Sequence, residues 1–169
     1  VLVHVLRQTG VDPGVLIGGV MQETNQSYAL GTGAPFVIEG DEYDSAYFDK
    51  RPKFMHYRPQ RAIVTSLEFD HADIFENEAD YRNAFEDFVG LLPSDGLLAL
   101  CGDHPAVRAL ASHTEATVRT YGLEAENDVR ATDLSSTADG THFTMTLGGT
   151  ATDVVLPLHG CHNVQNALA

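Results

Sequence analysis

Two short apolar runs, each followed at once by acidic residues, constrain the fold of this chain more than any other feature of its sequence. They predict strands over residues 36–39 and 62–67. The first strand is followed by an acidic segment that ends at Asp44, and the second by one that includes His71 and ends at Asp73. Apolar runs of this length are typical of buried parallel strands, whose carboxyl ends share one edge of a sheet. Ligands of open α/β sheets bind outside that edge. We therefore expect an α/β fold with both acidic segments at the binding edge.

The remaining segments alternate between helical and extended patterns, which indicates parallel β-α-β packing. Gly10 is expected to end a helix over 1–8, and apolar side chains recur on one helical face within 77–92. Further helices are expected at 104–112 and from 162. Further strands are expected at 15–17, 97–101 and 117–121, with a loop at 18–35. Three antiparallel strands are expected near the end of the chain, at 129–134, 142–147 and 153–158. The expected fold is a three-layer, mostly parallel α/β sheet with a small antiparallel sheet near the C-terminus.

Composition excludes several function classes. A net charge of −14 over 169 residues opposes binding to nucleic acid, which requires a basic face. No apolar run approaches the roughly 18 residues that a membrane span requires. The two cysteines, Cys101 and Cys161, stand apart without metal-type spacing, which favours a reducing cytoplasm. We expect one cytoplasmic domain with no nucleic-acid or membrane partner, and the sequence leaves its oligomeric state open.

Glu39 and His71 are the candidate metal ligands. Glu39 follows the first strand directly, and three more carboxylates crowd beside it within 41–44, so a cation would relieve their mutual repulsion. His71 lies among the aspartates of segment 70–73, and carboxylates with an imidazole suit a divalent cation such as Mg²⁺. The alternatives are a solvated strand end for Glu39 and a surface histidine paired with an aspartate for His71.

Three polar residues, His162, Asn163 and Asn166, stand at the start of the last expected helix. Taken alone, their spacing favours Asn163 as the residue that caps this helix, which is the commonest role of asparagine there. Asn166 follows three residues later and shares its helical face, so the alternative is that the pair contacts a planar base or a phosphate.

These elements together form three motifs that resemble those of the central, ATP-binding domain of the Mur ligases. The matching elements are E-x-D-E-x-D at 39–44, D-H-x-D at 70–73 and G-x-H-N-x-x-N at 160–166. Weaker matches lie between them, in the family's order, so the resemblance covers essentially the whole chain. It implies a fold like that of the P-loop NTPases.

The resemblance also implies an activity, cofactors and site residues. Mur ligases are ATP-dependent enzymes that form amide bonds through an acyl phosphate in peptidoglycan metabolism. By resemblance, Glu39 and His71 would hold Mg²⁺ as the catalytic and metal site, and His162, Asn163 and Asn166 would contact the adenine nucleotide.

Within the family, segments 42–54 and 68–75 resemble the members that act in peptidoglycan recycling. Those members join the tripeptide L-Ala-γ-D-Glu-meso-diaminopimelate to UDP-N-acetylmuramate. Two alternatives remain: the members that add L-alanine to UDP-N-acetylmuramate, and a nucleotide- or metal-binding homologue without ligase activity.

Residues 1–169 are expected to be a central domain alone. The family's phosphate loop, G-T-H-G-K-T-T, would lie just before Val1, and neither it nor the flanking N- and C-terminal domains is present. Ser66 also replaces the asparagine that is common before the D-H-x-D motif. We therefore expect that these residues by themselves do not catalyse turnover.

Overall fold

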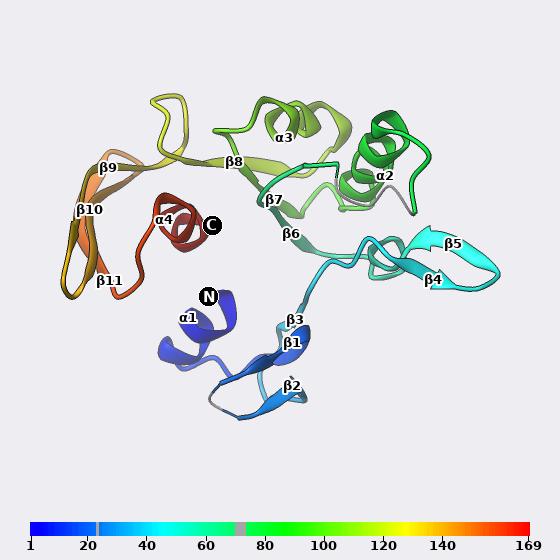
Figure 1. Ribbon diagram of the computed structural model, residues 1–169, viewed down its shortest axis with the longest axis horizontal. Coiled ribbons are helices and arrows are strands. Elements are labelled where there is room, and N and C mark those ends of the chain that lie inside the picture. The colour runs from blue at the N-terminus through cyan, green and yellow to red at the C-terminus, as the bar shows by residue number, and fades with distance from the viewer. Residues whose placement is uncertain (23, 70–73) are drawn as a thin grey trace. The chain divides into compact units, whose positions relative to one another are not determined.

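The chain folds into two units, residues 1–41 and 42–169. Figure 1 shows the computed structural model, which describes residues 1–22, 24–69 and 74–169.

The first unit holds one helix and a three-stranded sheet. The helix is α1 (Leu2–Gln8), and the strand order is β2 (Gln26–Ala29), β1 (Gly14–Met21), β3 (Phe36–Ile38). β1 is central: it pairs antiparallel with β2 and parallel with β3. The predicted strand at 15–17 is therefore the first part of a longer one, and β2 lies in the segment that was expected to be a loop.

Gly10 ends α1, as predicted from the sequence. Its φ of +82° is in the left-handed region, and its amide donates to the carbonyl of Arg7 at 3.0 Å. The amide of Val11 donates to the carbonyl of Leu6 at 2.9 Å. These two bonds satisfy carbonyls that the end of a helix would otherwise leave unpaired, in the arrangement that favours glycine.

The prediction that the strand at 36–39 is buried is wrong for β3. Phe36 is 57% exposed, and the next two residues are only half-buried. β3 lies at the edge of its sheet, with β1 on one side only. The apolar run correctly identified an extended segment but not its burial.

The second unit is built on a six-stranded sheet. Its order is β11 (Thr150–Leu156), β10 (Gly140–Leu147), β9 (Val129–Thr137), β8 (Thr117–Gly122), β7 (Leu97–Cys101), β6 (Arg61–Val64). Strands β6 to β9 are parallel, and β9 to β11 are antiparallel. The predicted antiparallel strands therefore exist but continue the parallel sheet, because β8 pairs with β9 at Tyr121 and Gly122.

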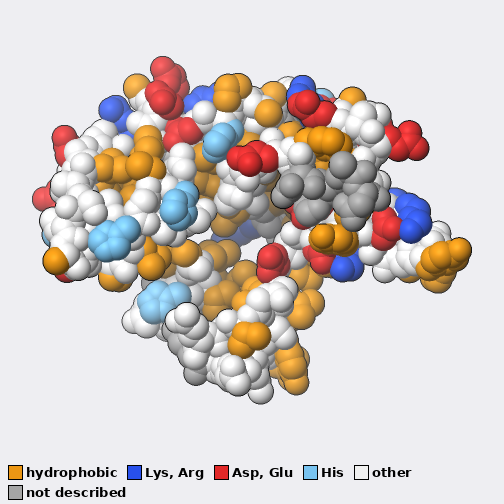
Figure 2. Space-filling model, in the orientation of Figure 1, with side chains coloured by type: hydrophobic (Ala, Val, Ile, Leu, Met, Phe, Trp, Pro, Cys, Tyr) orange, Lys and Arg blue, Asp and Glu red, His pale blue; other side chains and the backbone are white. Residues whose placement is uncertain are grey.

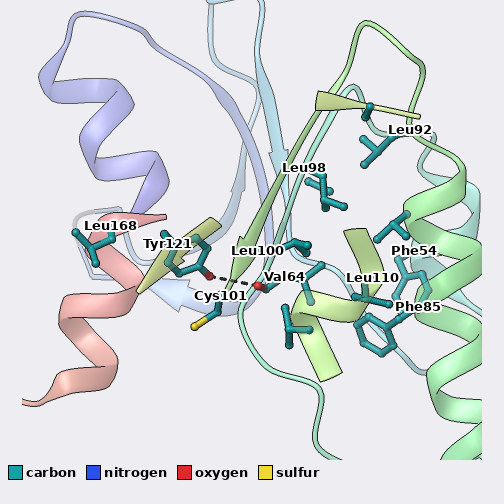
Figure 3. Close-up of a cluster of buried hydrophobic side chains, with 14 of the residues drawn as sticks. Phe54, Val64, Phe85, Leu92, Leu98, Leu100, Cys101, Leu110, Tyr121 and Leu168 are labelled. Atoms are coloured by element: carbon teal, nitrogen blue, oxygen red, sulfur yellow. Dashed lines mark hydrogen bonds between the residues drawn. The ribbon is translucent and has the colours of Figure 1, made fainter. Parts of the chain in front are cut away.

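Helices cover both faces of this sheet, which confirms the predicted three-layer α/β class. α2 (Glu78–Gly90) and α3 (Pro105–Ala109), which continues into a 3₁₀ turn at Leu110–His113, lie on one face, and α4 (Cys161–Leu168) lies on the other (Figures 1 and 3). A hairpin of β4 (Asp44–Ala46) and β5 (Asp49–Pro52) precedes the sheet and leads into a 3₁₀ turn at Lys53–His56.

The apolar face of α2 packs on the sheet as its periodicity predicts. Tyr81, Phe85 and Val89 are buried, and the ring of Phe54 lies 5.3 Å from that of Phe85 between centroids. Asn77 caps the helix, since its side-chain oxygen accepts from the amide of Asp80 at 3.0 Å.

A buried tyrosine links the carboxyl ends of two strands that are not neighbours. The hydroxyl of Tyr121 on β8 donates to the carbonyl of Val64 on β6 at 3.3 Å, across β7 (Figure 3). Burial raises the pKa of Tyr121 well above its usual range, so the hydroxyl keeps its proton. This bond satisfies the last carbonyl of β6.

Replacement of Leu100 by alanine tests this core. Leu100 is fully buried in β7, so Leu100→Ala should lower the free energy of unfolding by about 2–5 kcal/mol. Leu147→Ala is the matched control: Leu147 is 54% exposed, and its loss should change the free energy by less than about 1 kcal/mol. Denaturant unfolding of both variants provides the comparison, and equal losses would contradict the assigned core.

Candidate functional site

Glu39 directly follows β3 and is fixed against β1. Its amide donates to the carbonyl of Leu16 at 3.0 Å, and its Oε2 accepts from the amide of Gly18 at 2.7 Å. The side chain is exposed, and its Oε1 forms no hydrogen bond with the described residues. A carboxylate oriented through one oxygen, with the other oxygen open, fits the oxygen ligands that Mg²⁺ takes. Glu39 therefore has the chemistry that its predicted role requires.

One of the carboxylates in the acidic segment after Glu39 is paired with a lysine. Asp44 lies in β4 and forms an ion pair of 2.5 Å with Lys50. Within residues 1–22, 24–69 and 74–169, no group of three or more His, Cys, Asp or Glu side chains is arranged to bind a metal. The repulsion argument for a cation at 41–44 therefore does not extend to Asp44.

His71 and the rest of the D-H-x-D motif at 70–73 lie outside the described residues. The two strands that were expected to bring Glu39 and His71 to one edge pair with different partners: β3 pairs with β1, and β6 pairs with β7. A shared metal site for these two residues therefore stays a prediction.

The structure contradicts the interpretation of Asn163 as a helix cap. The residue in the cap position of α4 is Gly160, at φ +98°, and no side chain completes the cap. The side-chain nitrogen of Asn163 instead donates a hydrogen bond to the carbonyl of His159, at 2.8 Å. An L side chain rarely adopts the φ of Gly160, and a Cβ there would lie 2.8 Å from the ring of His162. Backbone geometry at the entry to α4, rather than asparagine, therefore sets where the helix begins.

The three residues predicted to contact the nucleotide lie away from the buried side of α4, which is apolar. Val164 and Leu168 are buried, whereas His162 and Asn166 are exposed and Asn163 is half-buried. Because α4 has 3.6 residues per turn, Asn163 and Asn166 share a face. That face presents amide donors and acceptors, which suit the edge of a planar base.

A junction centred on Asp103 lies at the carboxyl ends of β7 and β8. Asp103 lies just beyond β7, and the two oxygens of its carboxylate accept hydrogen bonds from four neighbouring groups. The donors are the amides of Leu123 at 2.8 Å and Glu124 at 3.0 Å, and the side-chain nitrogens of Asn127 and Gln165, both at 2.7 Å. Gln165 belongs to α4, so Asp103 ties that helix to the strand ends.

Two glycines leave room for this junction. A Cβ on Gly122, whose φ is +154°, would lie 2.2 Å from the carboxylate of Asp103. A Cβ on Gly102 would lie 2.0 Å from the side-chain oxygen of Asn127. Arg108 completes the arrangement, donating to the carbonyl of Gly102 and to that same oxygen of Asn127, each at 3.0 Å.

Hydrogen bonds keep the carboxylate of Asp103 charged. Burial raises its pKa, but the amides of Glu124 and Leu123 and the side chains of Gln165 and Asn127 together outweigh burial, so the pKa lies below its ordinary value. Asp103 was not among the site residues predicted from the sequence. The available signal was an acidic residue one glycine beyond the end of an apolar strand.

None of the described helices is long and apolar enough to cross a membrane.

Comparison with known proteins identifies related sequences and folds. A family model described as the Mur ligase middle domain matches residues 31–169. The UDP-N-acetylmuramate–L-alanine ligase of Nitrosospira multiformis is 36% identical over 173 residues, which cover 99% of this chain and 34% of that protein. The chain thus spans about a third of the length of this curated relative.

Two solved structures resemble the fold closely. The UDP-N-acetylmuramate:L-alanyl-γ-D-glutamyl-meso-diaminopimelate ligase from Neisseria meningitides is 38% identical with a TM-score of 0.85, covering 99% of this chain and 53% of that one. A murein peptide ligase from Psychrobacter arcticus is 33% identical with a TM-score of 0.78, covering 99% of this chain and 38% of that one.

The low pKa of Asp103 makes its contribution to stability depend on pH. Because the folded-state pKa lies below the ordinary value of 3.8, this contribution is complete above about pH 4 and is lost as the pH falls through the folded-state pKa. Asp103→Asn should therefore lower the melting temperature most at neutral pH, and the difference from the parent should shrink below about pH 4. Thermal unfolding of both proteins between neutral pH and pH values below about 4 measures this difference in melting temperature. A difference that does not change with pH would refute the lowered pKa of Asp103.

Proposed function

The chain belongs to the Mur ligase family, as a middle domain, and from this premise we propose that it is the nucleotide-binding domain of an ATP-dependent amide-bond ligase. The family match spans all five predicted site residues, from Glu39 to Asn166. The observation that carries the proposal is the placement of α4. The bond from Gln165 to Asp103 brings this helix to the carboxyl ends of β7 and β8, the edge at which open α/β sheets bind ligands.

The proposed reaction joins a carboxylate to an amine in two steps. The carboxylate of the UDP-sugar substrate attacks the γ-phosphorus of ATP, which forms an acyl phosphate and releases ADP. The amine of the second substrate then attacks the acyl carbon, so that the C–N bond forms, phosphate leaves and the amine loses a proton. In this proposal α4 orients the nucleotide through Asn163 and Asn166, with His162 beside them.

Mg²⁺ is part of the proposal because the nucleotide carries several negative charges. Glu39 and His71 would hold the ion, and the described geometry of Glu39, with one oxygen bonded to Gly18 and the other open, supports its part. When bound, Mg²⁺ supplies charge neutralisation at the phosphates. In a chain of net charge −14 this neutralisation is essential to attract an anionic nucleotide.

Two second substrates are supported by different relatives. A sequence relative is named for L-alanine, whereas the two solved structures are named for the recycled tripeptide or for murein peptide. We favour the tripeptide because segment 42–54, which contains the β4–β5 hairpin, resembles the recycling members of the family. Tyr47 and Phe48 at the tip of the hairpin are 93% and 91% exposed, and the apolar tip stands out in Figure 2. Core packing does not account for these two aromatic residues, which favours a contact outside this unit.

A ligation assay with the complete protein distinguishes the candidates. With ATP, Mg²⁺ and UDP-N-acetylmuramate, we expect ADP release and product with L-Ala-γ-D-Glu-meso-diaminopimelate, and kcat/KM at least about 100-fold lower with L-alanine, a difference of about 2.7 kcal/mol in transition-state binding. The reverse preference would establish the L-alanine ligase. No product with either amine would support a binding homologue without ligase activity.

Glu39 separates a metal ligand from a structural contact. Glu39→Gln keeps an oxygen that accepts from Gly18 but removes the charge, whereas Glu39→Ala removes both. If Glu39 binds Mg²⁺, both variants should lose about 100-fold or more in kcat/KM, on the scale reported for disrupted metal sites. The free energy of unfolding should change by about 1 kcal/mol or less in Glu39→Gln. If only Glu39→Ala is impaired, the hydrogen bond to Gly18 is the function of this residue.

A further inference from the structure

We propose that Asp103 is a positioning residue for the nucleotide: through Gln165 it fixes the orientation of α4, and so the places of Asn163 and Asn166. This inference rests on the proposed function, because it assumes that the polar face of α4 contacts ATP. It goes beyond that function in assigning the geometry of the face to a carboxylate on a different element.

The apolar contacts of α4 do not by themselves fix its orientation. Val164 and Leu168 are buried one turn apart on one side of a helix of eight residues. Apolar packing is not directional, so these two anchors hold α4 on the sheet but tolerate small rotations about its axis. A rotation would move the amide groups of Asn163 and Asn166 relative to a bound base.

Gln165 provides the directional contact that the apolar residues lack. It stands between Asn163 and Asn166 in sequence, and its Nε2 donates to Oδ2 of Asp103 at 2.7 Å. A hydrogen bond to a carboxylate is shorter and stronger than one between neutral groups. Because successive residues of a helix are offset by about 100°, a contact at Gln165 sets the direction of the face that carries the two asparagines.

Asp103 is suited to this role because it is itself held firmly. Its Oδ1 accepts from the amide of Glu124 and from Asn127, and Arg108 braces Asn127 from the other side. These contacts join the end of β7, the start of the β8–β9 connection and α3. These contacts therefore fix the orientation of α4 relative to the parallel strands, whose carboxyl ends form the proposed nucleotide-binding edge.

The test uses two substitutions of Gln165 in the complete protein. Gln165→Met keeps the length of the side chain but cannot donate, so we expect a rise of about tenfold in the KM for ATP, equivalent to about 1.4 kcal/mol, with kcat changed less than about twofold. Gln60→Met is the matched control, since Gln60 is exposed and its side chain forms no hydrogen bond with the described residues. It should leave both constants unchanged.

Gln165→Glu supplies a readout that a merely structural role would not produce. At about pH 8 the new carboxylate faces that of Asp103 and repels it, so the KM for ATP should rise at least as much as in Gln165→Met. As the pH falls toward about 6, the two carboxylates share a proton and the donor to Asp103 is restored. The ratio of the KM of this variant to that of the parent should then fall toward one, whereas the ratio for Gln165→Met stays constant.

Asn166→Ala separates failure of this inference from failure of the proposed function. A raised KM for ATP in Asn166→Ala, together with normal KM values in both Gln165 variants, would overturn the positioning role and keep α4 as the nucleotide contact. A normal KM in Asn166→Ala would overturn the proposed nucleotide contact of α4 and with it the positioning role, whereas the ligation assay tests the ligase activity itself. Loss of thermal stability in Gln165→Met without a change in KM, or a KM ratio for Gln165→Glu that ignores pH, would also overturn the positioning role.

Discussion

The second unit depends on one charged group that is satisfied by neutral donors. The carboxylate of Asp103 accepts hydrogen bonds from two backbone amides and two side-chain amides. Among the described residues, no cation pairs with it. A half-buried carboxylate without these bonds would be strongly unfavourable, so its donors must stay in place whenever it is charged. That requirement binds the end of β7, the β8–β9 connection and α4 into one arrangement, and it explains why Gly102 and Gly122 have no side chain.

The sequence predicted those parts of the fold whose signal is local. The helical face within 77–92 and the glycine that ends α1 are both encoded within a few neighbouring residues. β2 and the β4–β5 hairpin were missed because their segments are polar and short, so pairing with a partner strand decides their conformation. The burial of β3 was overestimated for a related reason: apolar composition does not reveal whether a strand has one neighbour or two.

The candidate site shows the same division. The position of His162, Asn163 and Asn166 on a helix was predictable, but the role of Asn163 at its start was not, because Gly160 occupies the cap position and Asn163 bonds to His159. The Asp103 junction was out of reach of local reasoning, since its partners lie 20 to 62 residues away along the chain. Contacts at that separation follow from the order of the strands, which the apolar pattern alone does not specify.

Glu39 and Asp103 illustrate why one sequence pattern leads to two roles. Glu39 follows β3 directly and Asp103 follows β7 after one glycine, and the carboxylate of each accepts a hydrogen bond from a backbone amide. Asp103 has both oxygens occupied by protein donors, so it has little capacity left for a ligand and acts on its neighbours instead. Glu39 is exposed, has one oxygen bonded to Gly18 and keeps the other open within the described residues. An acidic residue after a strand therefore indicates a place at the sheet edge, and the number of protein donors around it determines whether it holds the fold or is free to bind a cation.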